Sequence, residues 1–352
     1  MQQNRAVVCL DALRENARAF ASLASGAKLC AVVKADAYGH GAEQVCAALS
    51  GLADCYAVAL VAEGAALRAA GIREDILVLV PPLCEEEVLR GAHYGLIFTV
   101  GDGQDYSLIA RTCERYGLCA RCHIKANTGM NRFGFDLPEF RIFAAGRLSG
   151  RVFVEGIYSH FYRPEDKNTS RRQFGLFEQF CREGERTFGK LLRHISATGG
   201  TLSSPEYRLD MVRIGIGLYG YLPSGFSNSI SLRRVLSVYS TVVCTRNWRG
   251  GGAGYGDFCP GRGRLAAVRT GYADGFFRSG GVGNVNVLCM DAFLSGLPEK
   301  KYGEVCVFSD ADAYAAEHGT ISYEALVNVC GRAVKEYCLL YTSPSPRDPK
   351  TS

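Results

Sequence analysis

A lysine at the end of an apolar run is the first side chain whose type and position could do chemistry. Ala31-Val-Val-Lys34 continues into the small and polar residues Ala-Asp-Ala-Tyr38-Gly-His40-Gly41. At the carboxyl end of a barrel strand a lysine faces the site, and partial desolvation lowers its pKa so that the amine can form a Schiff base. A solvated lysine just past a strand is the alternative that composition alone favours.

Two further patterns offer other chemistry, and both are weak. Arg249-Gly-Gly-Gly-Ala-Gly-Tyr-Gly256 is similar to a nucleotide-binding loop, but such a loop opens a helix, and Asp257-Phe-Cys-Pro is a poor helix start. Fifteen cysteines are scattered through the chain, and Cys119-Ala-Arg-Cys122 has neither a second pair nor a histidine pair at ligand spacing. We therefore expect reduced thiols, no bound nucleotide and no metal site.

Composition limits the partners of this chain. It has 352 residues, with 40 Lys+Arg against 35 Asp+Glu, and the net charge of +5 is spread along its length. This predicts neither nucleic-acid binding nor a polybasic membrane patch. No apolar run approaches the roughly 18 residues of a membrane span, and the start Met1-Gln-Gln-Asn-Arg5 has no signal-peptide pattern. A cytoplasmic protein acting on a small molecule is the expectation.

Short β-rich runs alternate with helical patterns over residues 1–222, which we expect to form the first domain. Helices are predicted at Asp11–Ser25, Ala42–Ser50 and Val61–Ala70, and a glycine follows each of the last two. Eight strands in such an alternation favour a (β/α)8 barrel over a doubly wound sheet. The predicted strands are Lys28–Lys34, Cys55–Leu60, Asp75–Val80, Gly95–Val100, Cys119–Lys125, Val152–His160, Leu192–Ala197 and Val212–Leu218.

The pattern changes after Leu222, and a mostly β C-terminal domain is predicted over residues 223–337. Its predicted elements are the strands Ser237–Cys244, Arg264–Thr270, Asn284–Met290 and Glu304–Ser309 and a helix at Tyr323–Val334. Residues 338–352 break the pattern. Because Cys338–Asp348 is similar to the translation of a sequencing-library adapter, we expect this tail to be non-native.

The segment Val33–Gly41 closely resembles the pyridoxal-phosphate lysine motif of the alanine racemase family. Eight further stretches match that family in the same order along residues 5–337. They are Arg5–Leu13, Lys125–Gly134, Tyr158–Phe161, His194–Thr198, Val212–Gly220, Gly254–Gly256, Gly271–Gly275 with Arg278, and Met290–Asp291. The resemblance implies a homodimer in which each chain has a barrel that binds pyridoxal 5'-phosphate and a β domain.

The activity implied by the resemblance is that of an isomerase, which interconverts L-alanine and D-alanine and supplies D-alanine for peptidoglycan. The cofactor's aldehyde would join Lys34, and its ring would withdraw electrons from the substrate α-carbon. Racemisation removes a proton from one face and returns it to the other, so it takes two bases. By resemblance these are Lys34 and Tyr255 of the partner subunit. Without the family, Gly254-Tyr-Gly would indicate a hairpin tyrosine packed beside glycines.

The resemblance also implies which residues surround the cofactor. Arg213 matches the arginine that faces the pyridine nitrogen, where a permanent charge keeps the nitrogen unprotonated, and His194 matches the histidine that supports it. The phosphate is expected on the Tyr38 and Thr198 hydroxyls and on backbone amides. The cofactor contacts implied in this way are Lys34, Tyr38, His160, His194, Thr198, Arg213, Gly215 and Ile216.

Substrate contacts follow from the same matches. Arg132 matches the residue that holds the substrate carboxylate, and Met290 is a second substrate contact. Lys125 matches a lysine that is often carbamylated in the family, where the added anion separates two like charges and positions the arginine. A bare lysine at this position is the alternative. Tyr272 and Arg278 match residues of the entryway to the site.

The chain departs from the family pattern at three places. Ala197 and Thr198 stand where asparagine and serine are usual, so one polar contact is lost and the hydroxyl is kept. The segment between Arg278 and Met290 is shorter than usual and lacks a clear counterpart of a gate arginine. Gly331 stands where a tyrosine often fixes the catalytic residue, and a roomier pocket there would admit serine. A serine or broad-specificity racemase, a non-catalytic cofactor carrier and a degenerate racemase are the alternatives.

Overall fold

The computed structural model describes residues 4–226, 230–255, 264–278, 287–296 and 301–338. Contacts between residues divide the chain into two units. One unit consists of Arg14–Ala37 and Ala42–Leu232, and the other combines Met1–Leu13, Tyr38–Gly41 and Arg233–Ser352. Both units are therefore discontinuous in sequence. The boundary predicted at residue 222 remains a prediction, and the tail beyond Cys338 lies outside the described residues.

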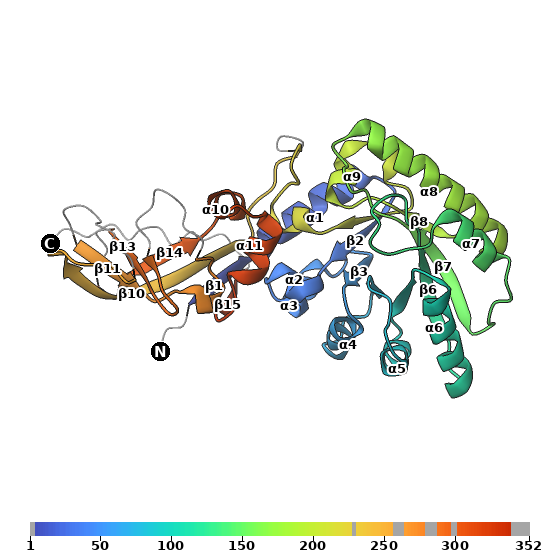
Figure 1. Ribbon diagram of the computed structural model, residues 1–352, viewed down its shortest axis with the longest axis horizontal. Coiled ribbons are helices and arrows are strands. Elements are labelled where there is room, and N and C mark those ends of the chain that lie inside the picture. The colour runs from blue at the N-terminus through green and yellow to red at the C-terminus, as the bar shows by residue number, and fades with distance from the viewer. Residues whose placement is uncertain (1–3, 227–229, 256–263, 279–286, 297–300, 339–352) are drawn as a thin grey trace. The chain divides into compact units, whose positions relative to one another are not determined.

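Eight parallel strands form a nearly closed barrel in the first unit (Figure 1). The order around the barrel follows the chain from β2 to β8, and β9 returns to pair with β2. The strands are β2 (Lys28–Val32), β3 (Cys55–Val58), β4 (Asp75–Val78), β5 (Ile97–Val100), β6 (Ala120–Lys125), β7 (Val152–Tyr158), β8 (Leu192–His194) and β9 (Met211–Ile214). Their carboxyl ends open at one end of the barrel, where catalytic side chains gather in this fold.

Helices between the strands cover the outside of the barrel (Figure 1). They are α1 (Leu10–Ala24), α3 (Ala42–Leu49), α4 (Val61–Ala69), α5 (Glu85–His93), α6 (Gly103–Tyr116), α7 (Leu137–Ala144), α8 (Lys167–Phe188) and α9 (Thr198–Ser203), with 3-10 turns η1 (Pro205–Tyr207) and η2 (Ile216–Tyr219). The short element α2 (Lys34–Tyr38), directly after β2, is a left-handed turn. Local signals set their ends. The Asp102 carboxylate accepts the backbone N–H groups of Gln104 and Asp105 at the start of α6, which ends at the left-handed Gly117.

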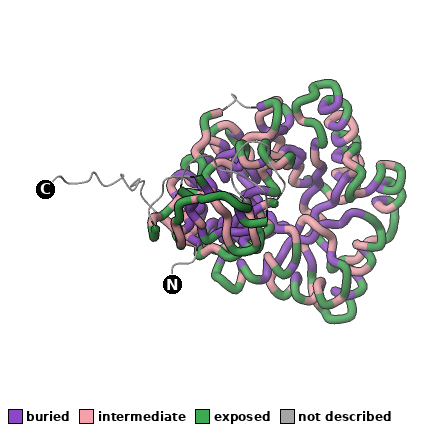
Figure 2. Tube along the Cα trace, turned by 60° about the vertical axis from the view of Figure 1, so that its left-hand side comes forward, coloured by how far each residue is buried: buried purple, intermediate pink, exposed green. Residues whose placement is uncertain are grey.

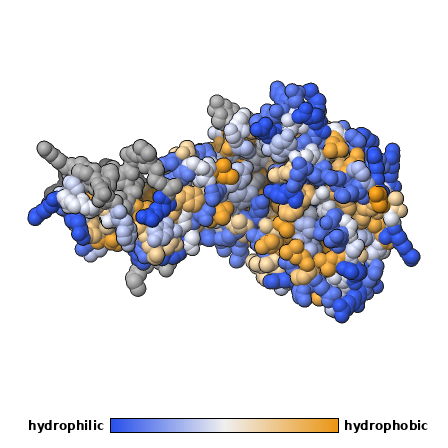
Figure 3. Space-filling view, viewed as in Figure 1, coloured by the Kyte–Doolittle hydropathy of each residue, from blue (hydrophilic) through white to orange (hydrophobic). Residues whose placement is uncertain are grey.

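Most barrel strands are buried on both faces, as parallel strands covered by helices should be, whereas β7 and β8 are partly exposed. Every residue of β3 and β5 is buried, and Figure 2 shows buried strands inside a rim of exposed helical segments. The long helix α8 buries Phe177 and Phe180 and presents mainly hydrophilic side chains outward (Figure 3). No helix among the described residues is long and apolar enough to span a membrane.

The second unit is built mainly from a sheet that mixes antiparallel and parallel pairs. Its strands are β1 (Arg5–Cys9), β10 (Leu236–Asn247), β11 (Arg264–Val268), β12 (Val287–Leu288), β13 (Phe293–Ser295), β14 (Glu304–Phe308) and β15 (Val334–Cys338). The order is β12-β13-β11-β10-β1-β15, and β14 also pairs with β10. Helices α10 (Ala311–His318) and α11 (Ser322–Asn328) and the turn η3 (Tyr272–Asp274) complete the unit.

The predicted fold class, a (β/α)8 barrel followed by a mostly β region, is confirmed. All eight predicted barrel strands are present, but six end earlier than predicted. The largest difference is at Val212–Leu218, because the chain leaves the strand at Ile214 and forms η2. The helix predicted at Tyr323–Val334 is wrong beyond Asn328, where a turn leads into β15. Part of the strand predicted at Asn284–Met290 lies outside the described residues.

Candidate active site

Lys34 lies two residues beyond β2, at the carboxyl end of the barrel strand. Immediately after it the chain enters a left-handed turn, with φ of 52°, 51° and 54° at Ala35, Asp36 and Ala37 and 55° at Tyr38. Each non-glycine residue in this conformation costs about 1–2 kcal/mol. Strain of this kind persists where the surrounding contacts overdetermine the backbone, and it is concentrated at functional sites.

The carboxylate of Glu63 holds this turn in place. One oxygen accepts the backbone N–H of Ala35 at 2.7 Å, and the other accepts the N–H groups of Ala59 and Leu60 at 2.7 and 3.0 Å. Glu63 also acts on Lys34 electrostatically. Partial burial and the nearby Arg132 guanidinium lower the pKa of the Lys34 amine, and the Glu63 charge opposes that shift.

Arg213, on β9, is buried at 3% exposure and has no carboxylate among its described hydrogen-bond partners. One guanidinium nitrogen donates to the carbonyls of Ser159 and Ile195 at 2.7 and 3.2 Å, and it lies 3.5 Å from His160 Nδ1. The other donates to His194 Nδ1 at 2.6 Å. Burial of a charge without a counter-ion is costly, so this position favours a ligand that carries negative charge.

Aromatic rings surround the charged groups. The Tyr158 ring stacks on His194 with centroids 4.9 Å apart, and the Lys125 amine and the Arg213 guanidinium lie 4.4 and 5.1 Å from its centroid. Tyr158 donates to or accepts from the Thr99 hydroxyl at 2.7 Å. Burial raises the pKa of Tyr158 to about 12, so this phenol stays neutral near pH 7. Its ring face stabilises cations by cation–π contact.

Lys125 ends β6 with only 7% of its surface exposed. Burial first, and then the Arg213 and Arg132 charges, hold the pKa of its amine well below the ordinary lysine value. A neutral amine is nucleophilic, whereas an ammonium is not. The Lys125 amine therefore gives up its proton more readily than an ordinary lysine does, which favours the nucleophilic neutral form.

Arg132 lies in the loop that follows β6 and is exposed. The loop folds back on itself, because Asn127 N–H donates to the Phe135 carbonyl at 2.9 Å and Phe135 N–H donates to the Lys125 carbonyl at 3.0 Å. Arg132 lines a cleft of about 510 Å³ at the carboxyl ends of β4, β5 and β6. Its charge lowers the pKa of both the Lys34 and the Lys125 amines, so Arg132 lies near both lysines.

Thr198, Gly215 and Ile216 meet where α9 and η2 begin. The N–H of Gly217 donates to the buried Thr198 hydroxyl at 3.3 Å. A Cβ at Gly217 would lie 2.5 Å from the Phe20 ring and 3.0 Å from Thr198, so a side chain there would close this corner. The first N–H groups of a helix have no partner inside it, which suits an anion.

The remaining predicted residues belong to the second unit. Tyr38 is buried, its ring centroid lies 6.0 Å from that of Tyr323, and burial raises its pKa. Tyr272 and Met290 are brought together, since Tyr272 N–H donates to Cys289 O and a Cβ at Gly271 would strike the Met290 carbonyl at 2.1 Å.

Two further predicted residues lie in that unit. Arg278 lines a separate pocket with Phe277 and His318. Tyr255 is 85% exposed. The contacts above join Tyr272 to Met290, and neither of these two residues lines the pocket at Arg278.

An ion cluster stabilises the pairing of Tyr272 with Met290. The Arg332 guanidinium donates to the Asp274 carboxylate at 3.0 and 3.2 Å and to Asp291 at 2.9 Å. Asp274 in turn accepts the N–H of Gly271 at 2.8 Å. The Arg332 side chain therefore joins the segment that carries Tyr272 to the segment that carries Met290.

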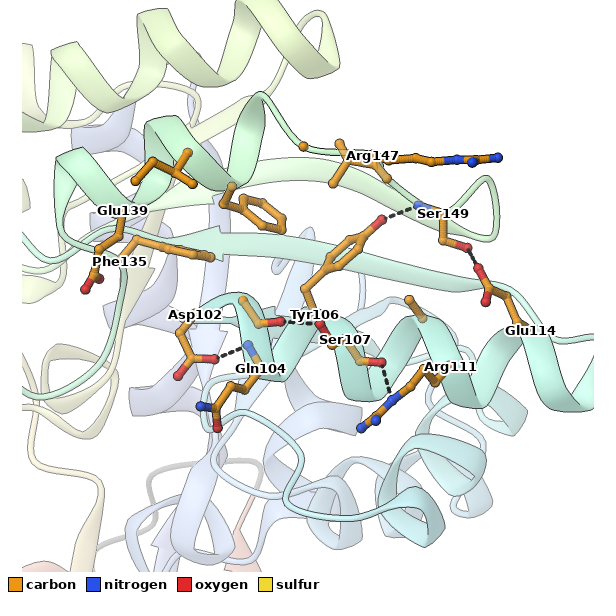
Figure 4. Close-up of a pocket in the computed structure, with 16 residues that line it drawn as sticks. Asp102, Gln104, Tyr106, Ser107, Arg111, Glu114, Phe135, Glu139, Arg147 and Ser149 are labelled. Atoms are coloured by element: carbon orange, nitrogen blue, oxygen red, sulfur yellow. Dashed lines mark hydrogen bonds between the residues drawn. The ribbon is translucent and has the colours of Figure 1, made fainter.

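A cavity of about 970 Å³ adjoins the Arg132 cleft, with which it shares Asp102 and Glu139 (Figure 4). It is on the outside of the barrel between α6 and α7, where the rings of Tyr106 and Phe143 meet edge to face. The Tyr106 hydroxyl accepts the N–H of Ser149 at 2.8 Å, and the Ser149 hydroxyl donates to Glu114. None of the predicted site residues lines it, so size alone does not locate the site.

Sequence reasoning missed three residues of the barrel site. Glu63 is 29 residues from Lys34 and no spacing links them. Tyr158 lies inside a matched stretch, but nothing in the sequence says that cations cover its ring. His123 could have been found, because Arg121, His123 and Lys125 alternate along one strand and must share a face.

The geometry defines a class of protein. A partly buried lysine amine, a buried guanidinium without a carboxylate, and an exposed arginine meet at the carboxyl end of a (β/α)8 barrel. Within the described residues no group of three metal-ligating side chains occurs. This is a barrel enzyme whose amine and cations suit an anionic ligand with a carbonyl carbon.

Comparisons with known proteins agree with this class. Residues 8–223 match the family model of the alanine racemase N-terminal domain. The alanine racemase of Desulfovibrio desulfuricans is 33% identical over 94% of this chain and 97% of its own length, and that of a Nostoc species is 32% identical over 92% of each. The solved alanine racemase of Clostridium difficile is 29% identical with a TM-score of 0.87, covering 96% of both chains. The chain belongs to the alanine racemase family.

Opposite charges at Glu63 and Arg132 predict opposite effects on Lys34. Glu63→Gln removes a negative charge and lowers the pKa of the amine, whereas Arg132→Gln removes a positive charge and raises it. Because only the neutral amine reacts with an aldehyde, the pH midpoint for binding of pyridoxal phosphate to the apoprotein moves down in the first variant and up in the second. Stopped-flow absorbance measures both.

The control is Glu87→Gln, which alters a carboxylate that accepts the Leu83 N–H far from Lys34. Its midpoint should equal that of the wild type. Shifts of the same sign in the Glu63 and Arg132 variants would contradict this assignment of charges.

Proposed function

We propose that this protein is a pyridoxal-phosphate-dependent racemase that interconverts L-alanine and D-alanine. The observation that carries the proposal is the Lys34 amine, whose pKa is lowered at the carboxyl end of a barrel strand. Relatives named alanine racemase match 92% or more of the chain, so the β region as well as the barrel is shared. A non-catalytic cofactor carrier would not require that second region.

The residues present fit the cofactor that this family uses. Pyridoxal phosphate supplies a carbonyl carbon for an amine and a ring that stabilises negative charge at the substrate α-carbon. The Lys34 amine would bind the cofactor covalently at this carbonyl carbon. Thr198 and the amides of Gly215 and Ile216 would hold the phosphate, with Tyr38 as a further hydroxyl contact. His160, beside Arg213, would line the ring.

Arg213 would set the electronic character of the bound ring. A guanidinium donates hydrogen bonds and does not give up its proton near pH 7. Placed at the ring nitrogen, it keeps that atom unprotonated and limits how strongly the ring withdraws electrons. A weaker electron sink favours return of the proton to the α-carbon over side reactions.

Two bases would exchange the α-proton on opposite faces of the substrate. Lys34 is one of them, and we propose Tyr255 of the partner subunit as the other. The 85% exposure of Tyr255 in a single chain supports a role across an interface. Tyr272 and Met290 would border the same shared site, with Arg278 nearer the entryway.

Arg132 would bind the substrate carboxylate, and Lys125 would position it as a carbamate. The reaction joins the neutral Lys125 amine to carbon dioxide, forming an N–C bond and releasing one proton, and it leaves an anion between two guanidinium groups. The burial of the amine, its lowered pKa and its two cationic neighbours support this step. Serine remains a second candidate substrate because glycine stands at position 331, where the family often has a tyrosine, although a Cβ there would lie 3.2 Å from the Asp274 carbonyl oxygen.

Carbamylation predicts a carbonyl carbon that exchanges with bicarbonate. Wild-type protein in ¹³C-bicarbonate should give one carbamate signal by carbon NMR, and Lys125→Gln should remove it. Lys190→Gln, a change at another lysine, is the matched control and should keep the signal. A wild-type spectrum without the signal would show that Lys125 is bare.

Sharing of Tyr255 predicts complementation between two inactive variants. Lys34→Ala and Tyr255→Phe each remove one base, so each homodimer should lose D-alanine formation. Mixed dimers restore one intact site, and random mixing should return about a quarter of wild-type activity. Chiral chromatography with L-alanine and L-serine in parallel measures the product.

The control mixes Lys34→Ala with the double variant Lys34→Ala/Tyr255→Phe, which leaves no intact site. It should remain inactive. Failure of the two single variants to complement, despite exchange of subunits, would place both bases in one chain or refute the assignment.

A further inference from the structure

A chain of hydrogen bonds runs from Arg213 into the interior of the barrel. Arg213 donates to His194 Nδ1 at 2.6 Å, and His194 Nε2 lies 3.0 Å from His123 Nδ1. All three side chains are buried, at 3%, 0% and 3% exposure. The two imidazoles meet edge to face at 5.1 Å between centroids.

The direction of each hydrogen bond follows from the first donor. A guanidinium has no acceptor atom, so His194 Nδ1 must be the unprotonated, accepting nitrogen. Neutral His194 then carries its proton on Nε2 and donates it to His123 Nδ1. His123 in turn must be unprotonated at Nδ1 and protonated at Nε2. Each link therefore fixes the tautomer of the next.

Neighbouring groups keep both imidazoles neutral. Burial, followed by the Arg121 charge, lowers the pKa of His123 to about 3. Burial and the Arg213 charge hold the pKa of His194 well below its ordinary value. A protonated His194 would turn an N–H toward the guanidinium and lose the hydrogen bond.

The barrel makes room for His123 at one position. β6 and β7 place His123 opposite Gly156, where an added Cβ would lie 2.7 Å from the imidazole. Arg121 lies on the same face of β6, and its guanidinium forms ion pairs with Asp75 and Glu155. These ion pairs direct its N–H groups to carboxylates rather than to the imidazole nitrogens. The backbone and these ion pairs leave His123 Nδ1 directed at His194.

We propose that His123 is a positioning residue: by accepting the Nε2–H of His194, whose tautomer Arg213 sets, it holds the His194 ring in place and so orients the Arg213 guanidinium toward the cofactor ring. The tautomer claim stands on this structure alone, and its consequence for the reaction rests on the proposed function. Loss of the acceptor leaves the buried His194 Nε2–H without this partner and lets the ring rotate, and Arg213 then loses one of its fixed partners.

Two substitutions at one position separate positioning from packing. Asparagine places its Oδ1 where the histidine Nδ1 lies and keeps an acceptor, whereas leucine fills similar space without one. His123→Leu should lower kcat about 10–100-fold, as loss of an outer-shell partner does in other sites. KM for alanine should change little, because Arg132 is untouched. His123→Asn should retain most of the wild-type kcat, and its bound cofactor should keep the wild-type absorption maximum.

A matched control removes a hydrogen bond from the barrel exterior. Tyr106→Phe deletes the hydroxyl that accepts the Ser149 N–H. It should lower the melting temperature without altering kcat or the cofactor spectrum. A general loss of stability would affect this variant as well, whereas loss of positioning would affect only His123→Leu.

Nitrogen NMR of the wild-type holoenzyme with ¹⁵N-labelled histidine tests the tautomers directly. We expect His194 and His123 each to be protonated on Nε2 alone, and the His194 nitrogen signals to shift and broaden in His123→Leu as the ring loses its Nε2–H acceptor. A wild-type His194 protonated on Nδ1, or equal kcat in the leucine and asparagine variants, would overturn the proposal. The NMR result does not depend on turnover, so an inactive wild type would refute the proposed function separately.

Discussion

Burial of the Arg213 charge is the constraint on which the rest of the barrel site depends. Removing such a charge from water has a penalty of several kcal/mol that only well-placed partners offset. Here carbonyl oxygens, a neutral imidazole and an aromatic face provide the partners, and no carboxylate is among the described ones. Burial first, and then the Arg213 charge, lower the pKa of Lys125 and His194, and a buried guanidinium without a carboxylate partner favours an anion.

The second constraint is the left-handed turn after Lys34. A helix or a continued strand would direct the lysine differently, and the turn is held by a carboxylate from α4 rather than by glycine. The same carboxylate opposes the loss of charge on the amine. Glu63 therefore links backbone strain to the protonation of the proposed catalytic group.

The architecture could be predicted because its signals lie between residues that are close in the sequence. These signals are the alternation of β-rich and helical runs and the glycines that follow helices. Sequence reasoning placed all eight barrel strands but extended the last to Leu218, since an apolar run looks the same in β9 and in η2. It also extended one helix past Asn328, where no proline marks the end.

The candidate site was predictable only in part. The resemblance supplied the residues with assigned roles, such as Lys34 and Arg213, and those roles remain predictions. Glu63 and His123 act through contacts between distant segments, and a pattern that describes neighbours in the chain does not contain them. The alternation of Arg121, His123 and Lys125 was the one local signal available.

The most direct test follows the α-proton of L-alanine in deuterated water with the wild-type enzyme and pyridoxal phosphate. Proton NMR reports exchange at the α-carbon, and chiral chromatography reports inversion. We predict that deuterium enters the α-position and that D-alanine rises until it equals L-alanine, because enantiomers have equal free energies. Exchange without inversion, or bound cofactor without exchange, would contradict the account.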